Sequence, residues 1–300
     1  KSLGDPGAFP YTRGIHPRMY VQRLGGRQAV VRRYGSFGTA EEAHDLLLTQ
    51  LNLLRDAPGK KGLSLAFSLT TQNGIDSDHR QAQGEVGRVG VVIDSLQDME
   101  DLFTDIAMGT LRTSMTINAT APILLAIYVA AAKKQGVPLD QLDGTIQNEV
   151  LKEYLSRGTY IYPYGPTMRL ARDVFVWAKQ HVPKFNTITF SGYHPREKGA
   201  TVEQEAAFAI ANALQYLSEA QRAGLTQQEL AQIMGRVAWF MNMKLPPFEE
   251  VAKYRAMRRV WATLVQDAFG MRVTADLPPE EAASYQQAQL MRVQSWAGGS

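Results

Sequence analysis

The sequence predicts a parallel α/β protein in which short strands alternate with longer helices. This alternation continues over most of the 300-residue chain and is typical of parallel β-α units. A closed barrel is favoured over an open doubly wound sheet, because the glycines of "GEVGRVG" (84–90) follow no clear strand and a dinucleotide-binding turn would. A Walker phosphate loop is absent as well.

The elements can be placed from periodicity and capping signals. Strands are expected at 62–69, 113–118, 144–148, 187–193, 235–242 and 290–296. Helices are expected at 39–55, 95–106, 121–135, 149–157, 166–181, 201–222, 226–234 and 247–269. In the helix at 201–222, Thr201 supplies an N-cap. One apolar face at helical spacing is formed there by Ala207, Ile210, Ala211, Leu214 and Leu217.

The predicted strands contain an unusual number of small polar residues. They are Ser64, Ser114, Thr116, Thr145, Gln147, Thr189 and Ser191. Barrel interiors are usually packed with branched apolar side chains, so this composition indicates an interior that accommodates a polar ligand. For any single residue the alternative is a hydroxyl or amide that only satisfies neighbouring backbone.

Composition excludes several other classes of protein. The formal net charge is +3 with acidic and basic residues interleaved, which argues against a nucleic-acid partner. No apolar run approaches the roughly 18 residues of a membrane span, and the first residues lack a signal-peptide centre. The chain has no cysteine, which fits a cytoplasmic location. "DSDH" (76–79) lacks a second pair of ligands, so no metal site is expected.

Two residues outside the strand interiors are candidates for chemistry. His194, in "SGYHPREKGA", follows a predicted strand, where barrel sites lie, and it could donate a hydrogen bond to a carbonyl oxygen. Arg157, in "EYLSRGTYIYP", ends a predicted helix and could bind a carboxylate. The plain alternatives are a packing histidine and an arginine that meets the helix dipole.

The sequence resembles the cobalamin-dependent acyl-CoA mutases of the methylmalonyl-CoA mutase family, in the part that binds the substrate. The matching stretches run in family order over residues 6–300. They include "PYTRG", "FGTAEE", "KGLSLAF", "GEVGRVGVVIDSLQDMEDLF", "SMTINATA", "GTIQNEVLKEYLSRGTYIYP", "PKFNTITFSGYH", "EVAKYRA" and "RRVWA". "SMTINATA", "TTQNGIDSDH" and "EYLSRGTYI" resemble the ethylmalonyl-CoA mutase branch most.

The resemblance implies a (β/α)8 TIM barrel threaded by coenzyme A, and a radical rearrangement of a short acyl-CoA thioester. The expected substrate is of the malonyl type, with methylmalonyl-CoA going to succinyl-CoA or ethylmalonyl-CoA to methylsuccinyl-CoA. Adenosylcobalamin is the implied cofactor, and a separate domain or chain would carry most of its binding site. The implied partners are that cobalamin-binding part and further subunits of a homo- or hetero-oligomer.

Roles are carried over by position. His194 matches the histidine that binds the thioester carbonyl, and Arg157 matches the arginine that grips a free carboxylate. Tyr34 matches a tyrosine pressed against the adenosyl group, and Arg32 is its basic neighbour. The remaining matches are substrate contacts at Thr145, Gln147, Asn186 and Gln294, and coenzyme A contacts at Arg23, Ser64, Ser114, Thr116 and Arg236.

The sequence also departs from the family pattern. "RLGGRQAVVRRY" is longer than usual and lacks a Trp and a Thr, Ala238 replaces a common serine, and the cobalamin motif Asp-x-His-x-x-Gly is absent. Residues 1–60 are expected to form an N-terminal arm and first helix. Residues 61–300 would then form about six of the eight β/α units, without the last strands. The alternative function is a non-catalytic or truncated subunit that binds a partner mutase.

Overall fold

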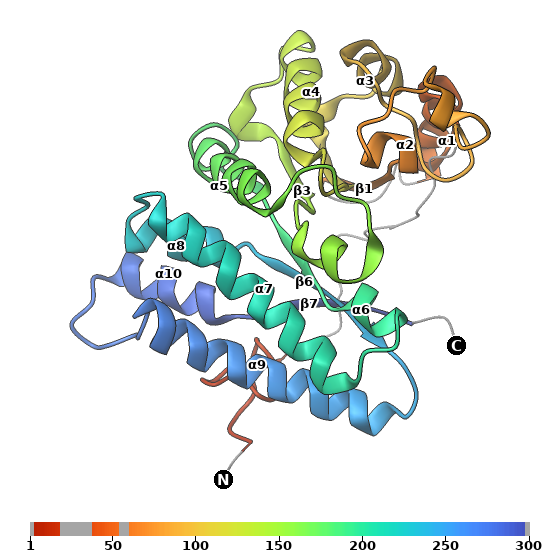
Figure 1. Cartoon of the computed structure of the whole chain (residues 1–300). Coiled ribbons are helices and arrows are strands. Elements are labelled where there is room, and N and C mark those ends of the chain that lie inside the picture. Colours follow the sequence, from red (N-terminus) through yellow and green to blue (C-terminus); the bar gives the residue numbers. More distant parts are fainter. Residues whose placement is uncertain (1–2, 19–37, 54–59, 298–300) are drawn as a thin grey trace. The chain divides into compact units, whose positions relative to one another are not determined.

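The protein was analysed as a computed structural model, which describes residues 3–18, 38–53 and 60–297 (Figure 1). Contacts divide the chain into two compact units. The β1–β4 unit comprises Gly25–Tyr154 and Gly158–Ile188, and the β5–β7 unit comprises Lys1–Leu24, Leu155–Arg157 and Thr189–Ser300.

The β1–β4 unit contains a parallel four-stranded sheet in the order β1-β2-β3-β4. The strands are β1 (Lys61–Ala66), β2 (Leu111–Thr116), β3 (Asp143–Ile146) and β4 (Phe185–Asn186). Neighbours in the sheet follow one another in the chain, and helices connect them. This is the arrangement of consecutive β/α units.

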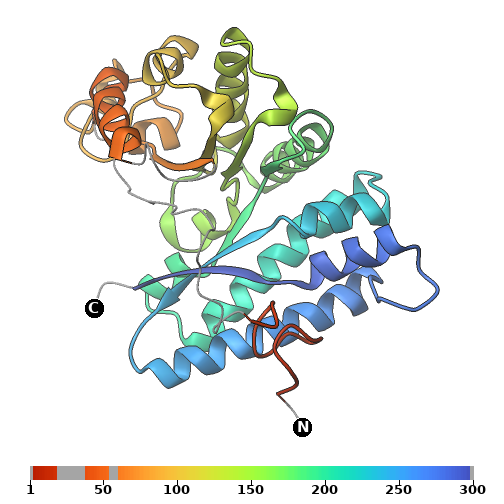
Figure 2. The same ribbon diagram turned by 180° about the vertical axis from the view of Figure 1, so that it is seen from behind.

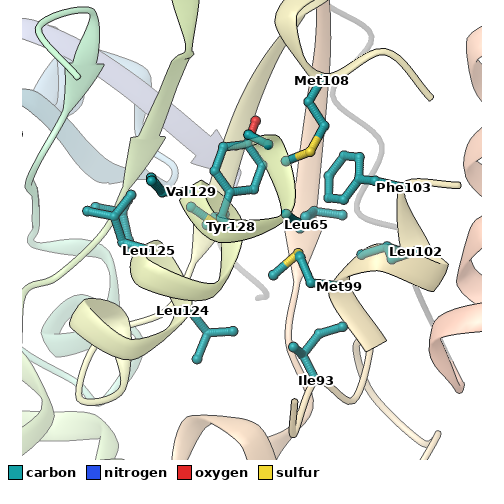
Figure 3. Packing of buried hydrophobic residues seen from close by; sticks show 14 of the residues in the cluster. Leu65, Ile93, Met99, Leu102, Phe103, Met108, Leu124, Leu125, Tyr128 and Val129 are labelled. Atoms are coloured by element: carbon teal, nitrogen blue, oxygen red, sulfur yellow. The ribbon is translucent and has the colours of Figure 1, made fainter. Parts of the chain in front are cut away.

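The helices of this unit cover a large hydrophobic core. They are α1 (Ala40–Leu53), α2 (Leu69–Gln72), α3 (Leu96–Leu102), α4 (Ala121–Lys134) and α5 (Tyr164–His181). Leu65 of β1, Met99 of α3 and Tyr128 of α4 are fully buried in this core (Figure 3). A capping box between Ser95 and Asp98 starts α3, which satisfies two backbone N–H groups at that helix end.

The β5–β7 unit contains a second parallel sheet, in the order β5-β6-β7. Its strands are β5 (Thr189–Ser191), β6 (Ala238–Met243) and β7 (Arg292–Ala297). Its helices are α6 (Tyr193–Glu197), α7 (Val202–Arg222), α8 (Gln227–Met234), α9 (Pro247–Phe269) and α10 (Pro279–Gln289) (Figure 2). Helices α7 and α9 pack on one face of this sheet, where Phe190 lies 5.9 Å from Tyr216 and Trp239 lies 4.9 Å from Trp261, between ring centroids.

The predicted parallel α/β class is confirmed, and the strand and helix order is that of part of a (β/α)8 barrel. Several elements differ from the prediction. The strand expected at 187–193 is shortened to β5, and its last residue begins α6. Strand β4, which lies before the expected range, and the short helix α2 were not predicted. The helix expected at 149–157 ends as a π-helix, Glu153–Arg157, and α10 was not predicted. None of the described helices is long and apolar enough to cross a membrane.

Candidate functional site

One row of polar residues crosses the whole β1–β4 sheet. Ser64 pairs in register with Ser114, Ser114 with Thr145, and Thr145 with Asn186. Register partners in a parallel sheet point to the same face, so these four side chains lie next to one another. Four residues that the sequence singled out separately are therefore brought together by the fold.

The row lies on the face of the sheet opposite the hydrophobic core. Most of the strand residues that alternate with it belong to the core cluster: Leu63, Leu65, Met115, Ile146 and Phe185. Ser64 and Asn186 are buried, and Ser114 and Thr145 are half-buried. Since successive side chains of a strand face opposite sides, the sequence places a polar surface on the side where a barrel normally has its packed interior.

Thr116 and Gln147 continue this polar face toward the carboxyl ends of the strands. The N–H of Gln147 donates to the carbonyl of Met115 at 3.2 Å, which extends the β2–β3 ladder one residue beyond β3. Gln147 is 8% exposed. Its side-chain Oε1 accepts a hydrogen bond from Nδ2 of Asn118 at 3.2 Å.

A buried charged cluster lies behind Gln147, and the sequence analysis missed it. Lys152, Glu149 and Glu153 are at most 1% exposed. Nζ of Lys152 lies 3.7 Å from Glu149 Oε2 and 3.8 Å from Glu153 Oε1, and it donates to Oδ1 of Asn118 at 3.1 Å. A Lys at i+3 from a Glu, in the helix expected at 149–157, was the available signal, but such pairs are usually solvated.

The same cluster holds the start of the loop that follows Arg157. Glu153 opens the π-helix that Arg157 ends, and Gly158 continues the chain with a left-handed φ of 87°. The N–H and hydroxyl of Thr159 donate to Oε2 of Glu153 at 3.2 and 2.5 Å. Arg157 itself is half-buried. A π-helical turn at such a position is often associated with a functional site.

In the β5–β7 unit, His194 lies in α6, directly after the carboxyl end of β5. Its Nδ1 is 2.9 Å from the hydroxyl oxygen of Ser191, the last residue of β5. The imidazole ring meets the Phe240 ring edge-on at a centroid distance of 5.9 Å, and Tyr193 stacks on Phe240 at 4.7 Å. The hydrogen bond to Ser191 and the aromatic packing therefore both orient the ring, and His194 is half-buried.

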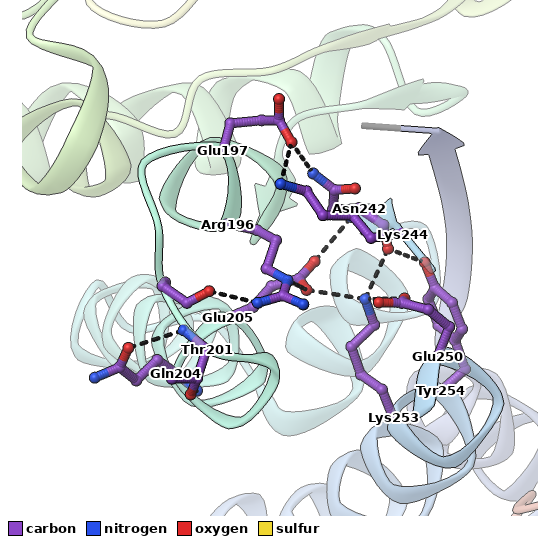
Figure 4. A network of polar contacts seen from close by, with 11 residues as sticks. Arg196, Glu197, Thr201, Gln204, Glu205, Asn242, Lys244, Glu250, Lys253 and Tyr254 are labelled. Atoms are coloured by element: carbon purple, nitrogen blue, oxygen red, sulfur yellow. Dashed lines mark hydrogen bonds and ion pairs between the residues drawn. The ribbon is translucent and has the colours of Figure 1, made fainter. Parts of the chain in front are cut away.

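Helix α6 is fixed by a second buried network (Figure 4). Nε of Arg196 lies 3.8 Å from Oε2 of Glu205, and Nδ2 of Asn242 donates to Oε1 of Glu197. Lys253 reaches Glu205 at 2.8 Å and the carbonyl of Asn242 at 2.7 Å. Burial raises the pKa of the Glu205 carboxyl, although Lys253 and the N–H of Asn242 act in the opposite direction.

Gln294 and Arg236 also belong to the β5–β7 unit, Gln294 within β7 and Arg236 just before β6. Gln294 is in register with Phe240, which is in register with Ser191. Arg236 is exposed just before β6, and Arg292 begins β7. Burial and the charge of Arg236 both lower the pKa of the Arg292 guanidinium. Two neighbouring cations at this edge would stabilise a bound anion.

Comparison with known proteins decides the family. The family model described as methylmalonyl-CoA mutase matches residues 1–277. The chain belongs to the methylmalonyl-CoA mutase family. The resemblance inferred from the sequence motifs is thereby confirmed.

Several curated members of the methylmalonyl-CoA mutase family are similar to this chain. The methylmalonyl-CoA mutase large subunit of Streptomyces virginiae is 44% identical over 261 residues, which are 87% of this chain and 34% of that protein. The 2-hydroxyisobutanoyl-CoA mutase large subunit of Aquincola tertiaricarbonis is 41% identical over 272 residues, 91% of this chain and 46% of that protein. The mitochondrial methylmalonyl-CoA mutase of Mus musculus is 40% identical over 264 residues, 88% of this chain and 34% of that protein. The chain thus spans between a third and a half of the length of these relatives.

Three of the residues matched to the methylmalonyl-CoA mutase family, Tyr34, Arg32 and Arg23, lie outside the described residues. The others occupy two groups. The β1–β4 unit holds Ser64, Ser114, Thr116, Thr145, Gln147 and Asn186, and the β5–β7 unit holds Arg157, His194, Arg236 and Gln294. The roles assigned to them remain predictions, as does the division of the chain at residue 60.

Proposed function

We propose that this chain is the acyl-CoA-binding part of an adenosylcobalamin-dependent acyl-CoA mutase that rearranges a malonyl-type thioester. The candidate reactions are methylmalonyl-CoA to succinyl-CoA and ethylmalonyl-CoA to methylsuccinyl-CoA. Besides family membership, the observation that carries the proposal is the row of Ser64, Ser114, Thr145 and Asn186 on the sheet face opposite the core.

The polar row suits the pantetheine arm of coenzyme A. That arm is a narrow chain with two amide groups, and buried amides need hydrogen-bond partners. Serine and threonine hydroxyls can donate or accept, and they leave more room than the branched side chains usual in a barrel. In this proposal Ser64, Ser114 and Thr116 contact the arm, and Arg236 contacts the phosphates.

His194 and Arg157 bind the acyl group in this proposal. With the Ser191 hydroxyl donating to Nδ1, His194 carries its proton on Nε2 and donates it to the thioester carbonyl oxygen. That hydrogen bond stabilises the charge that shifts onto the oxygen during rearrangement. Arg157 pairs with the free carboxylate of the substrate through its guanidinium.

The cofactor is assigned to another part of the enzyme. When bound, adenosylcobalamin supplies the radical that starts the rearrangement. The corrin ring itself supplies four nitrogens to the cobalt, so a protein needs to add at most one donor, and the motif Asp-x-His-x-x-Gly that would carry it is absent from this sequence. Nδ1 of His194 is engaged by Ser191. The residues proposed here are therefore assigned to binding and orienting the acyl-CoA. Relatives named large subunits support the proposal of a cobalamin-binding partner domain or subunit.

The proposal is tested by coenzyme A binding to the chain, measured by calorimetry. Thr116→Val removes one hydroxyl from the polar face without changing shape. Losing one hydrogen bond, worth about 1 kcal/mol, should weaken binding about fivefold. Thr104→Val makes the same change at an exposed position at the end of α3 and should leave affinity unchanged. Absence of coenzyme A binding to the unmodified chain would refute the proposal.

A further inference from the structure

Gln147 presents a fixed side of its amide group to the polar face of the β1–β4 sheet. Its Oε1 accepts from Nδ2 of Asn118 at 3.2 Å. Among the residues that the structure describes, none accepts a hydrogen bond from Nε2 of Gln147. The amide nitrogen, with its two N–H groups, is therefore the part of Gln147 available to a ligand.

The neighbours of Asn118 determine which way both amides point. Nζ of Lys152 and the N–H of Glu149 donate to Oδ1 of Asn118, at 3.1 and 3.2 Å. Nδ2 of Asn118 donates to Oε1 of Glu153 at 2.7 Å. An ammonium group can only donate and a carboxylate can only accept, so a flipped Asn118 would make unfavourable contacts on both sides.

Burial makes this arrangement rigid. Asn118 is 2% exposed, and Lys152 and Glu149 are fully buried, so water cannot replace a mismatched partner. A buried polar network specifies one arrangement when every member is satisfied. The ammonium of Lys152 thus fixes the orientation of the Asn118 amide, which in turn fixes the orientation of the Gln147 amide.

We propose that Asn118 is a positioning residue that holds Gln147 as a hydrogen-bond donor and thereby selects acyl-CoA substrates with an acceptor group beyond the thioester. This inference rests on the proposed acyl-CoA mutase function and deepens it. A free carboxylate is the acceptor that fits best, since it receives charge-assisted hydrogen bonds. An acyl chain ending in a methyl group would leave the Gln147 N–H groups unpaired.

The test exchanges donor and acceptor at position 118 in the whole cobalamin-binding protein. With Asn118→Asp, position 118 offers an oxygen, so Gln147 turns its nitrogen toward it and presents Oε1 to the ligand. We expect the dissociation constant for methylmalonyl-CoA to rise at least tenfold, while those for propionyl-CoA and free coenzyme A change less than twofold. Asn73→Asp, the same substitution at the C-cap of α2, should change none of them.

A second variant keeps the experiment decisive if Asn118→Asp fails to fold. Asn118→Asp combined with Glu153→Gln restores the net charge of the cluster and reverses the hydrogen bond between positions 118 and 153. The same loss of preference for methylmalonyl-CoA is expected. In a Gln147→Met background, Asn118→Asp should have no further effect on the preference, because it acts through Gln147.

The outcomes separate this inference from the proposed function. An equal loss for methylmalonyl-CoA and propionyl-CoA would mean that Asn118 is only structural, which overturns the inference. Additive effects of Asn118→Asp and Gln147→Met would overturn it as well. If the unmodified protein bound neither thioester, the proposed function itself would fail.

Discussion

Replacing Lys253 by Met should destabilise the protein in a strongly pH-dependent way. Lys253 is 1% exposed by side chain and lies 2.8 Å from Glu205 and 2.5 Å from Glu250, which are 0% and 3% exposed. At an effective dielectric constant of about 20, a pair at 2.8 Å attracts by about 6 kcal/mol. Without the lysine, two buried carboxylates lose their shared cation.

The stability that Lys253→Met loses at neutral pH is limited because a buried carboxylate can be protonated. A buried carboxylate without a partner takes up a proton instead of remaining charged. Holding a carboxyl of ordinary pKa 4.5 neutral at pH 7 costs 2.5 pH units at about 1.36 kcal/mol each, or about 3.4 kcal/mol. Arg196, whose Nε lies 3.8 Å from Glu205, remains as a cationic partner for one of the two carboxylates. The expected loss is therefore about 3–4 kcal/mol at pH 7, within the range for breaking a buried ion pair.

The sign of the pH dependence follows from the direction of the pKa shift. The folded-state pKa of Glu205 is already raised by burial, and removing Lys253 raises it further. A carboxyl group whose pKa is raised in the folded state stabilises that state fully at pH values below its unfolded-state pKa of about 4.5. This stabilisation is lost as the pH rises through the folded-state pKa. The difference in free energy of unfolding between the Lys253→Met variant and the wild type should thus shrink to about 1 kcal/mol at pH 5.

Urea unfolding at pH 5 and pH 7, followed by tryptophan fluorescence, measures this effect. Trp261 lies in the same helix as Lys253 and contacts Trp239. Lys244→Met is the control, because Lys244 pairs with Glu197 at 3.3 Å with both side chains about 30% exposed. Such a pair contributes at most about 1 kcal/mol. A loss at Lys253 that is independent of pH, or no larger than at Lys244, would refute the reasoning.

Three further predictions concern the site and the fold. His194→Ala should lower turnover in the cobalamin-loaded protein by about 10²–10³ with coenzyme A affinity unchanged, and normal turnover would make His194 a packing residue. Arg157→Gln should reduce turnover of malonyl-type thioesters far more than coenzyme A affinity; equal turnover of malonyl-type and simple acyl thioesters by the wild type would contradict its role. Gly90→Ala should destabilise the chain by more than 1 kcal/mol, because Gly90 has a φ of +79° and an added Cβ would lie 2.4 Å from the backbone carbon of Phe67; unchanged urea unfolding would contradict this.

The strands and their polar row were predictable because side chains alternate with a period of two. Ser64 stands between two leucines, and Ser114 and Thr145 are each followed by an apolar residue. The sequence could not show that they are register partners, since register depends on pairing between segments 30 to 50 residues apart. The short β4 was missed and β5 was predicted too long, because only pairing with β3 on one side and with β6 on the other defines these two strands.

The buried ions were not predictable from local patterns. In α7 the sequence predicted a face containing Ala207, Ala211 and Leu214, but Ala207 and Ala211 are exposed. The buried side of the helix includes Glu205, Ala209, Ala213, Tyr216 and Ala220. A helical pattern predicts a glutamate to be solvent-exposed. The partners that make the burial of Glu205 possible, Lys253 and the N–H of Asn242, lie 48 and 37 residues away in the sequence.

Each of the two units contains a buried lysine between two buried glutamates, next to its candidate site residues. Lys152 lies between Glu149 and Glu153 beside Gln147, and Lys253 lies between Glu205 and Glu250 in the network that anchors α6 and with it His194. Buried ion pairs are poor sources of stability, since apolar residues often do as well. Their hydrogen bonds are directional, however, and a fully satisfied network admits one arrangement. That condition holds for the side chains around Lys152, whereas Oδ1 of Asn242 and both carboxylate oxygens of Glu250 in the network behind α6 are buried without a hydrogen-bond partner. The network behind Gln147 is therefore the one that can fix the geometry of a site, and the network behind α6 holds its helix mainly through the ion pairs of Lys253.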